Sequence, residues 1–310
     1  MQIPVELRRR PPAPTLAWAA ATIGPAARVT RVQRLRNSWA AAMHAIDVVD
    51  GPGTHRLVLR RWARTDLPPD IGVVENEVAA LGLLAPASSP RLPVPRLVGA
   101  DAHAARTDVP AVLMTRLPGR GVLAPRDLDA FLDRLVEVLH AVHEVDVPPG
   151  TLNYFRPWSL DTVTAPPSWS RRPDVWERAI EIAHRPVPAH ERVLVHRDFW
   201  PGNVLWRRGN ITGVVDWTHA CRGPAAADVA HCRGNLALIF GLDVADDFAR
   251  RYGNAADLAW HDIADAVSMG DERAPSAAWR WHDAGRSDIT ANRIITVLDA
   301  ILAEAIERMS

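Results

Sequence analysis

The spacing of apolar residues changes at Pro118-Gly119 in this chain of 310 residues. Before this point apolar and polar residues mostly alternate, which is the pattern of half-buried strands. After it, apolar residues recur every three or four positions, as they do along one face of a helix. The sequence therefore predicts an α+β protein with two lobes: a small antiparallel-sheet N-lobe over residues 1–117 and a larger helical C-lobe over residues 118–310.

The expected elements follow from these two periods and from the turn residues between them. A helix near Thr15–Ile23 is expected to pack on the first lobe, because neighbouring prolines argue against a secretion signal there. The expected strands are 28–36, 43–50, 55–62, 96–100, 111–117, 193–195, 204–206 and 211–217. The expected helices are 70–84, 128–142 and 174–183, with mostly helix from 225 to 309.

The composition excludes several classes of protein. The 36 basic and 36 acidic residues balance, so charge gives no argument for nucleic-acid binding. No stretch reaches the roughly 18–20 apolar residues that a membrane-spanning helix needs, so no membrane association is expected. Two cysteines are too few for a disulfide framework or a zinc site, and we expect a cytoplasmic protein. Nothing in the sequence indicates an obligate protein partner.

Three polar residues near Val193–Trp217 carry the most specific chemical signal. Asp198 follows His196-Arg197, Asn203 lies five residues after Asp198, and Asp216 follows an apolar strand-like run. This is the spacing of a kinase catalytic loop, H-R-D-x-x-x-x-N, followed by a metal-binding aspartate. Asp198 is the predicted catalytic residue, which orients an acceptor hydroxyl. Asn203 and Asp216 are the predicted metal ligands, since Mg²⁺ prefers oxygen atoms.

The runs HRDFWPGNVLW, GVVDW and GPAAADVAH, in this order, resemble the signature of aminoglycoside phosphotransferases and related small-molecule kinases. Weaker motifs in the same order extend the resemblance over roughly residues 28–240. The resemblance implies a two-lobed protein-kinase-like fold and a Mg²⁺-dependent enzyme. Such an enzyme moves a phosphoryl group from ATP or GTP onto a small hydroxylated molecule. An aminoglycoside, a macrolide, a sugar and an amino alcohol all stay open as acceptors.

The same resemblance implies a nucleotide site in the N-lobe. Arg60 takes the place of the usual phosphate-binding lysine, with Glu77 as its partner on the helix 70–84. Met114 lies in the strand that leads to the hinge, and Ser38 lies in the turn that is expected to cover the phosphates. That turn, Leu35–His44, contains no glycine, although glycine lets backbone amides approach phosphate oxygens closely.

Other residues near the motif have structural explanations beside functional ones. Trp200 and Trp217 flank the catalytic residues, and each fits core packing and an acceptor-pocket wall equally well. His196 is expected to hold the loop and not to transfer protons. The resemblance makes Asp228 a buried acceptor for backbone amides and not a metal ligand.

The alternative is a nucleotide-binding pseudokinase with a regulatory or binding role. The arginine at position 60 and the glycine-free turn favour this alternative. The intact set of Asp198, Asn203 and Asp216 favours an enzyme, because a chain freed from catalysis has no reason to hold all three.

Overall fold

The chain forms two compact units in a computed structural model. Unit 1 runs up to Gly119 and takes in Thr212–His219, and unit 2 comprises Arg120–Ile211 and Ala220 onwards. The nucleotide-binding role expected for the N-lobe stays a prediction, as does our expectation that the C-lobe carries the catalytic loop and the acceptor site. The described residues are 3–35, 41–62, 71–158, 160, 163–189, 191–253, 255–271 and 273–309.

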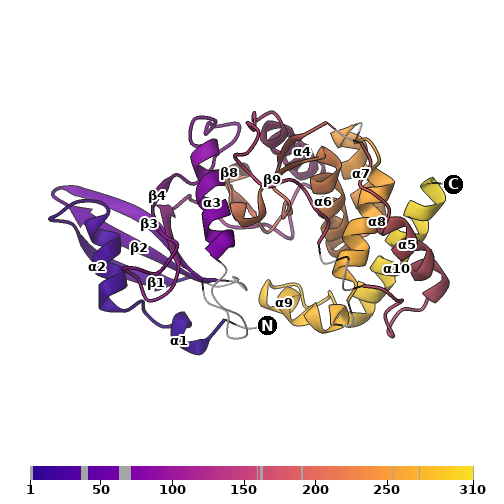
Figure 1. Cartoon of the computed structure of the whole chain (residues 1–310), viewed down its shortest axis with the longest axis horizontal. Coiled ribbons are helices and arrows are strands. Elements are labelled where there is room, and N and C mark those ends of the chain that lie inside the picture. The colour runs from indigo at the N-terminus through magenta and orange to yellow at the C-terminus, as the bar shows by residue number, and fades with distance from the viewer. Residues whose placement is uncertain are drawn as a thin grey trace. The chain divides into compact units, whose positions relative to one another are not determined.

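Unit 1 contains the antiparallel sheet that the alternating pattern predicts (Figure 1). Among the described residues the strand order is β1-β2-β3-β5-β4, and every neighbouring pair is antiparallel. Each strand begins and ends close to its expected run. The strands are β1 Arg28–Arg34, β2 Ala42–Asp50, β3 Gly53–Arg61, β4 Leu97–Asp101 and β5 Ala111–Thr115.

The alternation along β3 decides which way Arg60 points. Leu57 and Leu59 are buried in one core cluster with residues of α2 (Ala13–Ala21), the helix that was expected at the N-terminus. Because successive side chains of a strand point to opposite faces, Arg60 points away from α2. It meets α3 (Ile71–Leu84), which contacts β4 and β5. The apolar pattern of one face thus places a charged residue on the other.

Unit 2 is mainly helical, as expected. Its helix α6 is buried along most of its length, because α7, α8 and α10 pack against it. None of the helices described in either unit is both long and apolar enough to cross a membrane. The α-helices described in unit 2 are α4 Leu128–His143, α5 Pro173–Ala183, α6 Ala225–Phe240, α7 Leu242–Tyr252, α8 Leu258–Met269, α9 Ala278–Asp283 and α10 Ala291–Arg308.

Short strands frame the predicted catalytic motif. Asp198 follows β6, Asn203 directly precedes β7, and Asp216 follows β8. Arg208 and Gly209 both have positive φ, of 53° and 80°, which suits the tight turn between β7 and β8. β6 pairs with β9, and β7 pairs with β8. The bounds are β6 Val193–Val195, β7 Val204–Arg207, β8 Asn210–Val214 and β9 Cys221–Gly223.

Three local features differ from the sequence expectation. The helix α1 (Val5–Arg8) and the strand β9 were not expected, because elements this short show no apolar period. The strand expected to reach Trp217 ends at Val214 instead. The reason is the backbone of Asp216, whose φ of 70° is left-handed and cannot continue a strand. A short 3₁₀ helix, Trp217–His219, follows.

Candidate active site

Three charged side chains of unit 1 form a connected cluster. Arg60 Nη1 donates to Glu77 Oε1 at 2.7 Å, and Arg60 Nη2 donates to Asp216 Oδ1 at 2.7 Å. Arg60 and Glu77 are buried, whereas the Asp216 side chain is 33% exposed. Burial by itself lowers the pKa of Arg60, but Asp216 and Glu77 outweigh it and raise that pKa above its ordinary value. Arg60 is therefore a permanent cation between two carboxylates, and the expected Arg60–Glu77 pair is present.

Arg60 keeps one donor for a further partner. Its Nε is buried and has no hydrogen-bond partner within the described part of the chain. The guanidinium Cζ lies 4.4 Å from the ring centroid of Trp62, a cation–π contact that fixes the plane of the fork. A buried donor without an acceptor costs free energy. An anionic oxygen would satisfy it, and the planar fork of arginine suits phosphate oxygens.

The turn that carries Asp216 is tied to α3. Thr218 Oγ1 donates to Asp216 Oδ1 at 2.7 Å. Asn76 of α3 donates to the Thr218 carbonyl oxygen at 2.9 Å. The left-handed φ of Asp216 is uncommon for a residue with a side chain, and such strained positions cluster at functional sites. The turn therefore holds the Asp216 carboxylate in a defined direction.

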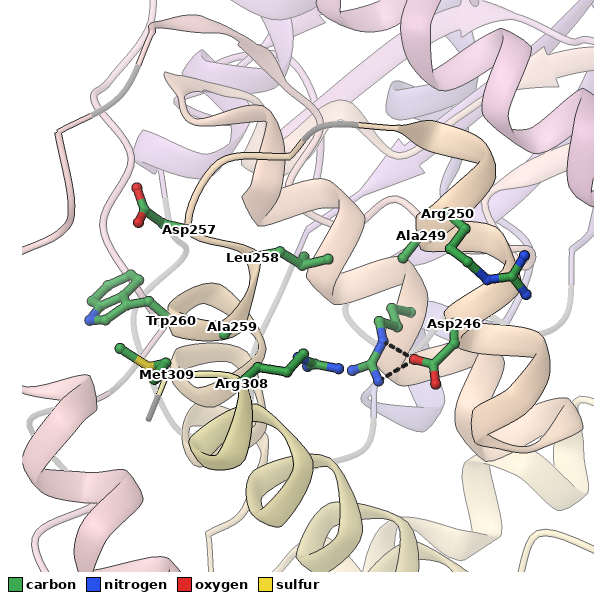
Figure 2. A pocket seen from close by; sticks show the side chains of 10 residues that line it. Asp246, Ala249, Arg250, Asp257, Leu258, Ala259, Trp260, Arg308 and Met309 are labelled. Carbon is green, nitrogen blue, oxygen red and sulfur yellow. Dashed lines mark hydrogen bonds and ion pairs between the residues drawn. The ribbon is translucent and has the colours of Figure 1, made fainter.

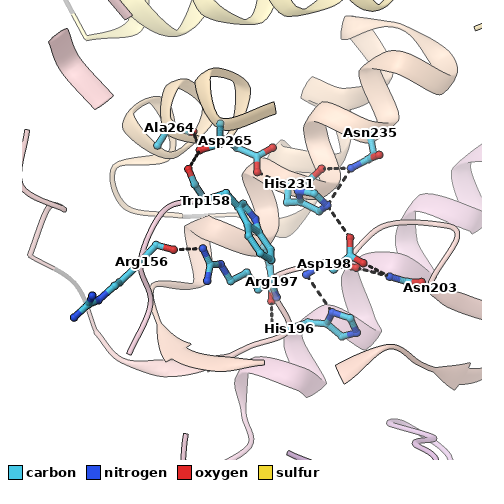
Figure 3. Close-up of polar contacts among 12 residues, drawn as sticks. Arg156, Trp158, His196, Arg197, Asp198, Asn203, His231, Asn235, Ala264 and Asp265 are labelled. Carbon is cyan, nitrogen blue, oxygen red and sulfur yellow. Dashed lines mark hydrogen bonds and ion pairs between the residues drawn. The ribbon is translucent and has the colours of Figure 1, made fainter. Parts of the chain in front are cut away.

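In unit 2, the Asp198 carboxylate has a partner on each oxygen (Figure 3). Asn203 Nδ2 donates to Asp198 Oδ2 and to the Asp198 carbonyl oxygen, both at 2.8 Å. His231 Nε2 lies 3.2 Å from Asp198 Oδ1, and the Asp198 side chain stays 32% exposed. Because an ionised Asp198 can only accept, the Asn203 NH₂ group must face it, and the Asn203 amide oxygen is turned away. That oxygen is the predicted magnesium ligand.

Asp228 holds the backbone of the loop before Asp198. Its carboxylate accepts from the backbone N–H groups of His196 at 2.7 Å and Arg197 at 2.6 Å, and His143 Nε2 lies 3.1 Å away. Burial raises the pKa of Asp228, but the hydrogen bond and charge of His143 help to bring it below its ordinary value. The predicted role of Asp228 as a buried amide acceptor is confirmed. Arg197 adopts a φ of 71°, a left-handed backbone conformation that is uncommon for a residue with a side chain.

The other nucleotide-site predictions concern Met114 and Ser38. Met114 is buried in β5, where it pairs with Val58 of β3 across the sheet. Ser38 lies outside the described residues, as does the middle of the glycine-free turn. The binding roles of both residues stay predictions.

The two candidate tryptophans have different environments. Trp200 is half-buried, and its ring stands edge-on to Trp281 with centroids 5.6 Å apart. Trp217 has no exposed surface, and its indole donates to the Val214 carbonyl oxygen at 2.9 Å. A ring without exposed surface offers no face to an acceptor. The structure therefore supports core packing for Trp217, which corrects its assignment to the acceptor pocket.

His231 of α6 and Asp265 of α8 were not expected near Asp198, yet both lie in this network (Figure 3). One signal for His231 was present, since it lies three residues after Asp228 and so shares a face of α6 with it. Asp265 gave no signal, because its contact depends on how α8 packs against α6.

One pocket in the described part of unit 2 has a volume of about 770 Å³, and Figure 2 shows the side chains that line it. Three of its charged lining residues, Arg233, Asp246 and Arg308, already form ion pairs. Arg233 pairs with Asp246, Asp262 and Glu304, and Arg308 also pairs with Asp262. None of the predicted site residues lines this pocket, so it gives no support to a catalytic role.

Several solved structures of small-molecule phosphotransferases share this α+β, protein-kinase-like fold. Aminoglycoside phosphotransferase APH(4)-Ia, in a ternary complex with AMP-PNP and hygromycin B, matches with a TM-score of 0.59 and 18% identity, over 89% of this chain and 94% of that one. Macrolide 2′-phosphotransferase MphH from Brachybacterium faecium gives 0.58 and 20%, over 91% and 97%. Spectinomycin phosphotransferase APH(9)-Ia, with ADP and spectinomycin, gives 0.54 and 12%, over 90% and 94%.

The sequence also identifies the family. Residues 31–265 match the model of the phosphotransferase enzyme family, which is more than half of the chain. The chain belongs to this phosphotransferase enzyme family. No curated protein matches the chain. The predicted fold class and family are confirmed.

Proposed function

We propose that the chain is a Mg²⁺-dependent O-phosphotransferase that moves the γ-phosphoryl group of ATP or GTP onto a hydroxyl of a small molecule. The observation that carries this proposal is the state of Asp198. Its carboxylate is held on both oxygens, yet 32% of the side chain stays exposed. A group that orients an acceptor must combine a fixed direction with access to the acceptor. The Arg60–Glu77–Asp216 cluster supports the nucleotide half of the proposal.

Asp198 accepts a hydrogen bond from the acceptor hydroxyl and so directs the hydroxyl oxygen at the γ-phosphorus. That oxygen forms the new O–P bond while the bond from the γ-phosphorus to the β–γ bridging oxygen breaks. The hydroxyl proton passes to Asp198 and then to water, and ADP or GDP leaves with the bridging oxygen. Because the transition state is loose, positioning and charge neutralisation contribute more than a strong base.

Each of the two predicted ligands offers an oxygen atom that suits a magnesium ion. The Asn203 amide oxygen is turned away from Asp198, and the Asp216 carboxylate is partly exposed. Amide and carboxylate oxygens are the ligands that Mg²⁺ takes. When bound, the ion supplies positive charge that offsets the charge of the phosphates. Arg60 Nε, which has no hydrogen-bond partner among the described residues, gives a further donor for a phosphate oxygen.

The structurally similar phosphotransferases indicate only a general class of acceptor for this chain. Two of these structures contain hygromycin B and spectinomycin as bound molecules, and a third is a macrolide 2′-phosphotransferase. We extend to this chain only the general class of small-molecule acceptor.

The proposal is tested by release of ADP or GDP in the presence of a panel of acceptors. The panel contains aminoglycosides, macrolides, simple sugars and amino alcohols, each with and without EDTA. We expect at least one member to give acceptor-dependent release that EDTA abolishes. Release that is independent of every acceptor, or that persists in EDTA, would count against the proposal.

Arg60→Ala is expected to weaken use of the nucleotide. Loss of charge-assisted hydrogen bonds worth about 1.5–3 kcal/mol should raise the nucleotide KM roughly 10-fold or more and lower kcat. Arg60→Lys should retain part of the nucleotide affinity, because lysine keeps the positive charge but lacks the planar fork of arginine. Arg56→Ala, an exposed position on the same face of β3, is the control. Steady-state kinetics with varied nucleotide measure the effect, and an equal rise in the acceptor KM would contradict the assignment.

Trp200→Ala is expected to raise the acceptor KM, by roughly 3-fold or more, because a partly exposed aromatic face near Asp198 suits a sugar ring or a cationic group. Its nucleotide KM should stay unchanged. Steady-state kinetics with varied acceptor and varied nucleotide measure the two KM values, after thermal unfolding has shown that the variant is folded. An unchanged acceptor KM would place the acceptor elsewhere.

A second candidate is a nucleotide-binding protein without turnover. The contact between Arg60 and Asp216 favours it, because this contact uses one oxygen of a predicted metal ligand. Tight Mg²⁺-nucleotide binding without transfer to any member of the panel would support this candidate.

A further inference from the structure

His231 lies between two carboxylates of unit 2 (Figure 3). Its Nε2 is 3.2 Å from Asp198 Oδ1, and its Nδ1 is 3.0 Å from Asp265 Oδ1. An ionised carboxylate can only accept hydrogen bonds, so both ring nitrogens must donate. Either neutral tautomer would leave one carboxylate facing a bare nitrogen. The imidazolium form, with a proton on each ring nitrogen, satisfies both carboxylates.

The surroundings of the ring stabilise this charge. The His231 side chain is only 10% exposed, and burial by itself lowers its pKa. Asp265 and Asp198 outweigh burial and hold the pKa well above its ordinary value. The remaining polar neighbour, Asn235, is neutral; its Nδ2 lies 3.3 Å from Nε2 and donates to the His231 carbonyl oxygen. The ionisable groups in hydrogen-bonding contact with the ring are thus both acidic.

We propose that His231 is a positioning residue for phosphoryl transfer: its imidazolium, anchored by Asp265, fixes the Asp198 carboxylate and balances its charge. This inference rests on the proposed function. Asp198 must lie close to the acceptor oxygen and hence to the γ-phosphoryl group, and both groups are negative. Like charges repel more strongly where water is excluded. A cation in contact with Asp198 reduces this repulsion without occupying the exposed part of the carboxylate.

The two partners of Asp198 divide the work of holding it. Asn203 fixes Oδ2 from the loop that precedes β7, and His231 fixes Oδ1 from α6. Asp265 in turn fixes the ring from α8. The side chain that orients the acceptor is therefore connected to two packed helices, which a loop residue alone would not be.

Two substitutions of His231 separate this role from packing. His231→Leu fills a similar volume without donors, whereas His231→Gln keeps a donor near the position of Nε2. We expect His231→Leu to lower kcat about 10- to 100-fold, the scale of a lost positioned polar group, with both KM values within about 2-fold. His231→Gln should recover part of the rate. Thermal unfolding checks that both variants are folded.

A double-mutant cycle with Asp198→Asn gives the decisive kinetic comparison. If His231 acts through Asp198, His231→Leu should change the rate of the Asp198→Asn enzyme by less than about 2-fold. The reason is that the energetic effects of substitutions within one hydrogen-bond network are not additive. Full multiplication of the two effects would overturn the proposal, as would a His231→Leu enzyme as fast as wild type.

The charge state can be read without any acceptor. Nitrogen-15 NMR of the histidine rings at pH 8 should show His231 with both nitrogens protonated, and Asp265→Asn should return it to a neutral ring. His231→Leu assigns the signal. A neutral His231 in wild type would overturn the proposal whether or not transfer is found. If no acceptor is phosphorylated, the proposed function fails, while this measurement still decides the state of His231.

Discussion

Asp216→Ala is expected to abolish magnesium-dependent nucleotide binding together with turnover. Asp216 is the only carboxylate among the predicted metal ligands, and its oxygen also neutralises Arg60 at 2.7 Å. Removing it takes away the anionic ligand and leaves the Arg60 charge with Glu77 alone. We expect the affinity for Mg²⁺-ATP to fall at least about 100-fold, since loss of a ligand should exceed the 10- to 100-fold cost of losing an outer-shell partner. Titration calorimetry with and without Mg²⁺ measures it.

Asp216→Asn and a folding test control this experiment. The asparagine keeps the volume and one oxygen but not the charge, so it should retain weak binding if only geometry matters. Thermal unfolding must show that Asp216→Ala remains folded, because it also loses the Thr218 contact at 2.7 Å. Unchanged Mg²⁺-ATP affinity in a folded Asp216→Ala protein would remove Asp216 from the metal site.

Asp198→Asn is expected to leave nucleotide binding nearly intact and to lower kcat by roughly 10² or more, the scale of positioned general acid–base catalysis. The amide keeps the shape of the side chain but cannot take the hydroxyl proton. It also presents an NH₂ group to Asn203 or to His231, both of which donate to Asp198 now. Calorimetry for Mg²⁺-ATP and one rate assay read the two effects separately.

Asp243→Asn is the matched control for this change of charge, since Asp243 lies exposed at the start of α7. It should behave as wild type in both assays. Equal losses of nucleotide affinity and kcat in Asp198→Asn would show that Asp198 holds the nucleotide and does not orient the acceptor.

Much of the fold was predictable because it depends on local periodicity. The alternation in β3 placed Leu57 and Leu59 on a buried face and so placed Arg60 opposite them. The helical period placed Glu77 on the face of α3 that meets Arg60, while Glu75 is exposed. The spacing of Asp198 and Asn203 likewise sets up a contact within one loop.

The rest depends on contacts between residues far apart in the chain. Arg60 meets Asp216 across 156 positions, and Asp198 meets His231 across 33. No periodicity encodes such pairs, because they follow from how whole elements pack. Burial of Trp217 was open for the same reason: the sequence places a large ring after a strand but does not say what covers it.

Transfer of labelled phosphate tests the central claim most directly. Wild-type protein, Mg²⁺ and ATP labelled in the γ-phosphate are incubated with the acceptor that performs best in the panel, and the product is identified by mass spectrometry. We predict one labelled phosphate on an acceptor hydroxyl for each ADP formed, no product without Mg²⁺, and a roughly 100-fold slower reaction with Asp198→Asn. Nucleotide binding with no labelled acceptor from any member of the panel, or equal product from Asp198→Asn, would contradict the account.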